Sequence, residues 1–332
     1  MSENSFAMLL LVIVLAIGFD LVNGWTDAPN AIATVVSTRV MPPTAAVLMA
    51  GTLNVLGAFV STKVAKTIGS GILDKSAVTL PTIMAALAAV IIWGSAAWYF
   101  GLPISKSHGL IAALAGAGMA AGGISVLLWA GWRKVFEGIG FSTFLGFGTG
   151  LILIVAIYWI VRNMRPALVR NVFGRLQILS AAFMAFSHGT NDAQKTMGVI
   201  TLALAVHYGW TDFKVPLWVI FLSACVIGFG TFFGAWRVVK TLGIRLTKLE
   251  PVHGFAAETG AGIVIQAASH FGIPLSTTHV IGTSIMGVGA SRRLSAVRWG
   301  VAGNIVSAWI LTFPICGVLA FVLSKLFNLA FR

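Results

Sequence analysis

The stretch GLPISKSHGLIAALAGAGMAAGG, residues 101–123, has a counterpart in GIPLSTTHVIGTSIMGVGA, residues 272–290. Each begins with Gly-x-Pro-x-Ser-x-[Ser/Thr]-His and continues into a glycine-rich apolar run. Proline suits the first turn of a helix, because its missing N–H group is not needed there. We therefore expect a helix to begin at each motif, with its free N–H groups and the positive end of its dipole pointing into the protein.

A second pair of segments precedes the first. NGWTDAPNAIATVV, residues 23–36, resembles SHGTNDAQKTMGVI, residues 187–200, and both contain Gly, then Asp, then Ala. Asp27 precedes Pro103 by 76 residues, and Asp192 precedes Pro274 by 82 residues. The same order at nearly equal spacing predicts two repeats, at 1–162 and 176–332, joined by a basic cytoplasmic linker at 163–175.

The composition is that of a membrane protein. Of the 332 residues 58% are hydrophobic and 9% are charged, whereas soluble domains have about 25% charged residues. Long, nearly charge-free runs occur, and a helix needs about 20 apolar residues to cross the hydrocarbon. We predict an all-α polytopic membrane protein with about ten passes, broken helices, helical hairpins and no cofactor. The apolar runs are 6–19, 45–60, 81–100, 141–161, 215–235 and 297–323.

The positive charges predict the orientation. The net charge of +13 is explained by Lys and Arg in cytoplasmic loops, so no nucleic acid is needed as a partner. Placing the basic clusters at 162–175, 237–248 and 292–298 in the cytoplasm puts the N- and C-termini outside the cell membrane. The first repeat then starts outside and the second inside. Such inverted repeats with interrupted helices are typical of secondary transporters, whose substrate sites lie near the bilayer midplane.

The two Pro-x-Ser motifs predict an anion site. If the repeat brings their helix starts together, backbone N–H and side-chain O–H groups surround one space, and this suits a tetrahedral oxyanion. Hydroxyl groups that cap helices or bond to backbone carbonyls are the alternative interpretation. The hydroxyl-bearing candidates for substrate binding are Ser105, Ser107, Ser276, Thr277 and Thr278.

Two carboxylates in the other pair of motifs predict a cation site. A charged Asp costs about 2.5–3.5 kcal/mol at the centre of a membrane even on lenient scales. Asp27 and Asp192 cannot help an anion directly, so we expect them to hold a coupling cation, Na⁺ or H⁺. An ion pair with Lys195 is the alternative for Asp192, whereas Asp27 has no such neighbour in sequence. The nearby side chains that offer oxygens for Na⁺, or amide donors for the anion, are Asn23, Thr26, Asn30 and Asn191.

Further polar residues in apolar surroundings are candidates for the wall of the site. His108 and His279 follow the hydroxyl groups, but an intramembrane histidine is more often a packing group. Glu258 is a candidate for the wall or for a coupling proton, and Lys195 is a candidate for the wall. Lys106 is expected to extend to the cytoplasmic surface, with a position facing the anion as the alternative.

Four short motifs carry a resemblance to a known family. They are GWTD at 24–27, GTND at 189–192, PISKSH at 103–108 and PLSTTH at 274–279. The chain resembles the shorter bacterial members of the inorganic phosphate transporter (PiT) family over essentially its whole length. The resemblance implies a cation-coupled phosphate symporter built from two inverted repeats and assembled as a homodimer. It assigns Asn191 and the five hydroxyl residues to phosphate, and Asp27, Asn30 and Asp192 to the coupling ion.

Two residues depart from the family pattern. Thr26 stands where the pattern has Asn, and Lys106 stands where it has a hydroxyl residue. Both belong to the first repeat, so Na⁺ at Asp27 and Asp192 and H⁺ stay equal candidates for coupling. We predict a secondary active symporter that moves inorganic phosphate into the cell by alternating access.

Other functions stay as alternatives to this prediction. A permease for sulfate or another tetrahedral oxyanion would use the same fold, and an anion channel would share the lining. A membrane enzyme is disfavoured, because Ser107 and His108 are adjacent in sequence and have no clear third partner.

Overall fold

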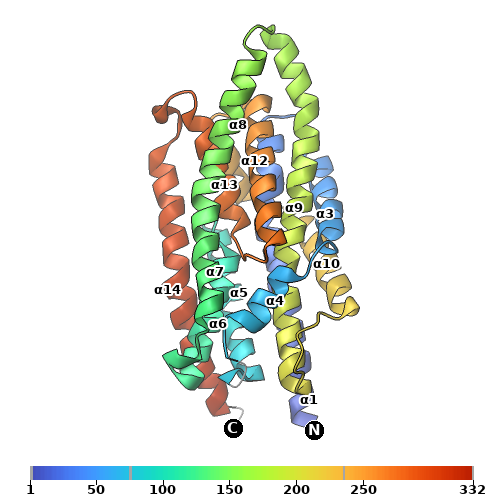
Figure 1. The fold of residues 1–332 in the computed structure, drawn as a ribbon, viewed down its shortest axis with the longest axis vertical. Coiled ribbons are helices and arrows are strands. Elements are labelled where there is room, and N and C mark those ends of the chain that lie inside the picture. Colours follow the sequence, from blue (N-terminus) through green and yellow to red (C-terminus); the bar gives the residue numbers. More distant parts are fainter. Residues whose placement is uncertain (1–2, 75–76, 235, 331–332) are drawn as a thin grey trace.

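The computed structural model describes residues 3–74, 77–234 and 236–330. The regular elements in these ranges are helices packed into an elongated bundle (Figure 1). Those of the first part are α1 (Glu3–Asp27), α2 (Pro29–Ser37), α3 (Pro43–Ala58), α4 (Lys63–Gly71), α5 (Leu80–Tyr99), α6 (Lys106–Gly122), η2 (Ile124–Val126), α7 (Trp129–Gly140), η3 (Phe141–Leu145) and α8 (Gly146–Val161). Those of the second part are α9 (Pro166–Tyr208), α10 (Leu217–Thr231), α11 (Trp236–Lys240), η4 (Thr241–Arg245), α12 (Pro251–His270), α13 (Thr277–Ala290), η5 (Leu294–Ala296) and α14 (Trp299–Ala330).

Both ends of the chain lie at one end of the bundle, and the turn from α8 to α9 lies at the other (Figure 1). Residues 166–175 of the expected linker belong to α9, which runs for 43 residues from the proline at its first turn to Tyr208, with Gly209 as its C-cap. Gly209 has a φ of +69°, a left-handed conformation that glycine adopts readily at the end of a helix. The division into repeats and the side on which the termini lie stay predictions.

Several described helices are long and apolar enough to cross a membrane. Four qualify by length and composition: 5–37, α5, 129–161 and α14. Two bent pairs bring the number to six if each pair forms one span: α3 with α4, bent by 70°, and α10 with 236–245, bent by 65°. The expected ten passes stay a prediction.

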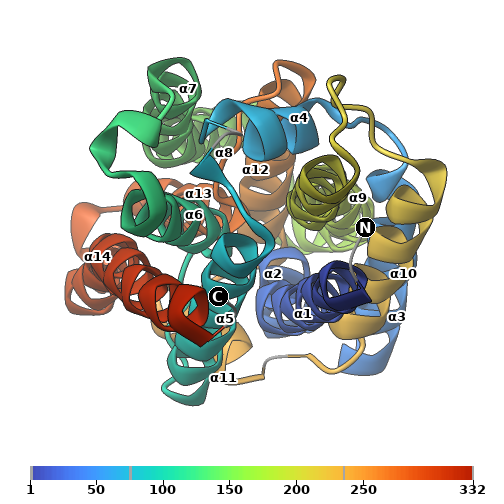
Figure 2. The same ribbon diagram turned by 90° about the horizontal axis from the view of Figure 1, so that it is seen from below.

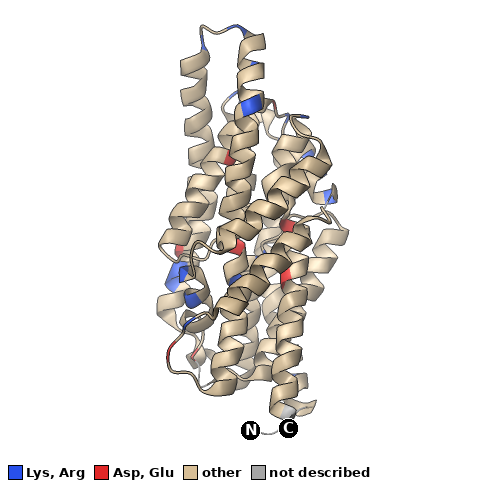
Figure 3. Ribbon diagram, turned by 90° about the vertical axis from the view of Figure 1, so that its right-hand side faces the viewer, with Lys and Arg blue, Asp and Glu red and all other residues tan. Residues whose placement is uncertain are grey.

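The outside of the bundle is apolar and its interior holds polar side chains. Large apolar residues such as Phe144, Leu217 and Ile310 are exposed on helix surfaces, as expected for contact with lipid. Figure 3 shows charged residues at mid-height of the bundle as well as near its ends. The buried charged side chains there therefore need a specific explanation.

The Pro-x-Ser motifs form the tips of two helical hairpins, α5–α6 and α12–α13. Gly101 and Gly272 follow the first helix of each pair with φ values of +69° and +66°, which a residue with a side chain adopts only with strain. The side chains of Ser105 and Ser276 then cap the second helix by accepting the N–H groups of His108 and His279. Helices α12 and α13 thus form an antiparallel pair that turns at a buried tip.

The hairpin tips meet inside the protein. The hydroxyl of Ser107 donates a hydrogen bond of 2.8 Å to the carbonyl oxygen of Leu275 in the opposite tip. Viewed from below, α5 and α6 lie beside α14, while α1 lies with α9 and α10 (Figure 2). The interior polar residues therefore lie where these two groups of helices face each other.

The two Asp motifs lie on helices of different continuity. Helix α1 ends at Asp27, and α2 begins with Pro29, which lacks the N–H group that would continue the helical hydrogen bonds. Helix α9 runs through Asp192 without a break. The sequence similarity of these segments thus does not extend to the helix break.

Candidate functional site

The hydroxyl groups of the two tips lie close together and are buried. Asn30 on α2 donates from its amide nitrogen to the hydroxyl oxygens of Thr277, at 3.3 Å, and Thr278, at 3.0 Å. Together with the bond from Ser107 to Leu275, these contacts join α2, α6 and α13 at one point. The predicted Ser107, Thr277, Thr278 and Asn30 are thus brought together, and Ser105 and Ser276 lie next to them along the chain.

Four of these hydroxyl groups keep a donor available. A hydroxyl has one O–H donor and two acceptor positions. Ser105 and Ser276 accept backbone N–H groups, and Thr277 and Thr278 accept from Asn30, so each uses an acceptor position and retains its O–H. The capping role that was the alternative interpretation is therefore present, and it leaves the O–H groups free to bind an anion.

Asp192 on α9 lies in the centre of a charged group. Its carboxylate is 2.7 Å from the ammonium group of Lys195 and 3.4 Å from the imidazole of His188. The amide of Asn23 on α1 donates to the same carboxylate at 3.4 Å. The ion pair with Lys195 considered from the sequence is therefore present.

Asp27 also has an ammonium partner, and that partner is Lys106. The two groups form a buried ion pair, with each residue only 3% exposed. The expectation that Lys106 extends to the cytoplasmic surface is wrong. The partner is 79 residues away in sequence, so the neighbours of Asp27 along the chain could not reveal it.

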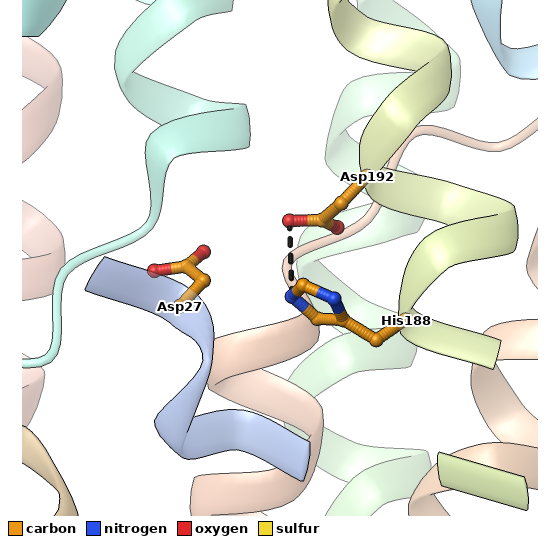
Figure 4. A group of neighbouring side chains, drawn as sticks. All are labelled: Asp27, His188 and Asp192. Carbon is orange, nitrogen blue, oxygen red and sulfur yellow. Dashed lines mark ion pairs between the residues drawn. The ribbon is translucent and has the colours of Figure 1, made fainter. Parts of the chain in front are cut away.

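The two carboxylates come close to each other around His188. One ligand atom each from Asp27, His188 and Asp192 lies within 4.8 Å of the other two, and Figure 4 shows the side chains facing one common space. Carboxylate and imidazole groups in this arrangement can bind a cation. Here the ammonium groups of Lys106 and Lys195 already neutralise the carboxylates, so the protein itself supplies the positive charges at this site.

Other predicted residues contribute in different ways. Asn191 donates to the hydroxyl of Ser269 near the end of α12 at 3.0 Å, and its amide oxygen is buried without a hydrogen-bond partner among the described residues. The hydroxyl of Thr26 bonds to the carbonyl oxygen of Val22 in its own helix. Thr26 therefore directs its donor away from both carboxylates.

His108 and His279 pack against each other where the hairpins meet. Their ring centroids are 4.7 Å apart in an edge-to-face arrangement. The His279 ring also stacks on Trp309 at 3.8 Å, and the His108 ring stacks on Phe313 at 5.1 Å. These contacts make the two imidazoles a joint between the tips and α14.

Glu258 lies in a separate buried cluster. Its carboxylate accepts hydrogen bonds from the hydroxyls of Thr34 and Ser180 and, at 3.3 Å, from the amide of Gln177. Thr34 follows Asn30 by four residues on α2, a distance of about 6 Å along the helix. Glu258 is therefore one helical turn beyond the hydroxyl cluster rather than in its wall.

Asp20 is a buried carboxylate that the sequence reading did not single out. It is 0% exposed and lies seven residues before Asp27 on α1. The rule that an intramembrane carboxylate marks a functional site by default would have found it. Asp20 directly follows the apolar run 6–19, and a hydropathy average over such a run is little changed by one charged residue.

The site as a whole balances its charges. Asp27 and Asp192 are offset by Lys106 and Lys195, so the four charged side chains have no net charge. The hydroxyl groups of Thr277 and Thr278 gather around Asn30, three residues after Asp27. This combination can accept a small, many-oxygen anion by hydrogen bonds when a positive charge arrives with it.

Comparison with known proteins gives consistent matches. The model of the phosphate transporter family matches residues 23–320. The chain is 45% identical over 318 residues to the probable low-affinity inorganic phosphate transporter of Rhizobium meliloti (strain 1021), covering 95% of each chain. It is 40% identical over 327 residues to the protein of the same name from Bacillus subtilis (strain 168), covering 97% of this chain and 98% of that one.

A solved structure has the same fold. The chain superposes on a protein described as the sodium-dependent phosphate transporter with a TM-score of 0.83 and 25% sequence identity. The match covers 97% of this chain and 99% of that chain. The relatives are named as transporters, which is not an enzymatic role.

Proposed function

This chain belongs to the phosphate transporter family, and from that premise we propose that it is a secondary active symporter carrying inorganic phosphate into the cell with protons. The observation that carries the proposal is the meeting of two hydroxyl-rich hairpin tips beside two lysine-paired carboxylates. The hydroxyl groups of the tips bind the anion, and the coupling ion acts on the charge of the buried carboxylate region beside them.

The proposed mechanism is alternating access by two inverted repeats. The elements pair in order: α1–α2 with α9, α3–α4 with α10–α11, α5–α6 with α12–α13, and α7–α8 with α14. The bends of 70° and 65° occur in corresponding pairs, and the hairpins lie in opposite halves of the bundle in Figure 1. Rocking of one repeat against the other would open the tips first to one side and then to the other.

The proposed substrate is phosphate rather than sulfate. Both anions accept hydrogen bonds from Ser105, Ser276, Thr277 and Thr278. Only phosphate carries a hydrogen near neutral pH, so only phosphate can donate a hydrogen bond to a buried acceptor. The free amide oxygen of Asn191 supplies that acceptor, and an acceptor facing sulfate would be left unpaired at a cost of about 1–3 kcal/mol.

The proposed coupling ion is the proton. Because the lysine and aspartate charges cancel, phosphate would leave the site negative unless a cation accompanied it. A metal ion needs several oxygen ligands at once, but here the carboxylate oxygens are already paired with ammonium groups. A proton needs only one lone pair and can therefore bind where a metal ion cannot.

The remaining parts of the proposal concern assembly and orientation. We place the chain in the cell membrane with both termini outside, because the basic clusters then lie in the cytoplasm. A homodimer, implied by the family resemblance, completes the proposal.

Uptake of radiolabelled phosphate into proteoliposomes tests the function. We expect saturable uptake when the outside is acidic, little uptake with a Na⁺ gradient at equal pH, and weak competition by sulfate. Asp192→Asn should abolish the pH-driven uptake, because it leaves the Lys195 ammonium group without its counter-charge.

Three results would contradict parts of the proposal. Uptake driven by Na⁺ at equal pH would replace the proton by sodium. Equal competition by sulfate would indicate a general oxyanion permease. No saturable uptake under either gradient would reject the symporter.

A further inference from the structure

Asp20 differs from the other buried carboxylates because, within the described part of the chain, neither an ion pair nor a hydrogen bond of normal geometry holds it. Among the described residues four carboxylates are buried: Asp20, Asp27, Asp192 and Glu258. Asp27 and Asp192 have ammonium partners, and Glu258 accepts three hydrogen bonds. Neither oxygen of Asp20 has a hydrogen-bond partner within the described part of the chain. A buried carboxylate in this position is costly as an anion and stable as a neutral acid.

The surroundings of Asp20 offer charge from one helix only. Helix α1 packs against α5, α9 and α10, and neither α5 nor α10 contains a charged residue or a histidine. From α9, Asp20 faces the hydroxyl of Thr196 and the charges of Asp192 and Lys195. The Thr196 hydroxyl likewise lacks a hydrogen-bond partner of normal geometry among the described residues.

The face of α9 near Asp20 continues into the substrate region. Asp192 and Thr196 are four residues apart and therefore lie on one face of the helix. Asp20 precedes Asp27 by about 10 Å along α1. Lys195 pairs with Asp192 and also acts on Asp20, so a change of charge on Asp20 is felt at the carboxylate beside the anion site.

We propose that Asp20 binds the coupling proton, an inference that rests on the proposed proton symport. With the proton bound, Asp20 is neutral and Lys195 stays with Asp192. When the proton leaves, the Asp20 carboxylate competes with Asp192 for the Lys195 ammonium group. Release of the proton thereby weakens the pairing of Lys195 with Asp192 beside the phosphate site. Binding of the proton and binding of phosphate are linked in this way.

The test compares two transport modes of Asp20→Asn in proteoliposomes. Asparagine resembles the protonated acid, so phosphate exchange at equal concentration and equal pH on both sides should continue within about twofold of wild type. Accumulation driven by an acidic exterior should fall at least about tenfold, because the proton can no longer be bound and released. Asp20→Glu keeps an ionisable group and should retain driven accumulation with a shifted pH profile.

Asp212→Asn is the matched control, because it makes the same chemical change at an exposed position and should leave both modes intact. Driven accumulation that survives in Asp20→Asn would overturn the inference. Loss of both modes in an Asp20→Asn protein that elutes as a single folded species would overturn it as well. A wild type without phosphate exchange would instead refute the proposed function.

Discussion

The ammonium group of Lys106, the first residue of α6, is buried against the carboxylate of Asp27, the last residue of α1. The pair connects the tip of the first hairpin to the break between α1 and α2. It therefore joins the element that offers hydroxyl donors to the element that offers a carboxylate.

Removing one member of this pair should be far worse than removing both. Lys106→Met leaves the Asp27 carboxylate buried and unpaired, at a cost of roughly 3–5 kcal/mol. Lys106→Met with Asp27→Asn should recover most of the thermal stability in detergent, yet phosphate uptake should stay abolished because the carboxylate is gone. Additive losses of stability in the two single variants and the double variant would show that the groups are not coupled.

A substitution of Ser276, the serine at the second tip, can distinguish its capping role from a role in anion binding. Ser276→Gly should cost only a few tenths of a kcal/mol in stability, since glycine is tolerated at an N-cap. It also removes an O–H donor to a charged ligand, worth about 1.5–3 kcal/mol, so the KM for phosphate should rise roughly 10- to 100-fold. Ser276→Thr keeps the hydroxyl and is the control for KM and thermal stability. An unchanged KM in Ser276→Gly would exclude this hydroxyl from the site.

Local signals in the sequence were sufficient to predict where the second helix of each hairpin begins. The glycine that ends one helix, the proline after it and the serine that caps the next all act within a few residues of one another. This is why Gly101 and Gly272 mark the turns in the sequence as well as in the structure.

The pairings across the bundle could not be predicted in this way. Lys106 finds Asp27 only when α6 packs near α1, and no spacing rule relates residues 79 positions apart. Glu258, a candidate for the wall or for a coupling proton, is buried, but its hydroxyl partners on α2 and α9 depend on tertiary packing. Distance along the chain thus separates what the motifs predict from what only the structure reveals.

Close packing of α6 on α14 predicts a stability effect far from the charged site. A Cβ atom at Gly116 would lie 2.0 Å from the carbonyl oxygen of Gly317, so one backbone would have to move. Gly116→Ala should therefore destabilise the protein by about 1–3 kcal/mol, measured by thermal unfolding in one detergent. Gly300→Ala is the control, because nothing lies within 4 Å of its added Cβ, and it should be neutral or stabilising by up to about 1 kcal/mol. Equal effects in both variants would contradict the close contact.

The ion pair between Glu250 and Arg292, at the base of the second hairpin, should weaken at acidic pH. Burial works against the charge on Glu250, but the hydrogen bond and charge of Arg292, at 2.8 Å, outweigh it and hold the pKa of this carboxyl below its usual 4.5. A lowered pKa in the folded state means that the contribution to stability is present above that usual value and is lost as the pH falls through the lowered one. Amide hydrogen exchange at 250–253 and 291–293, corrected for intrinsic rates, should therefore rise between about pH 6 and pH 3. Glu250→Gln should show the faster exchange throughout this range with no step, whereas a step of unchanged size in that variant would assign the transition to another group.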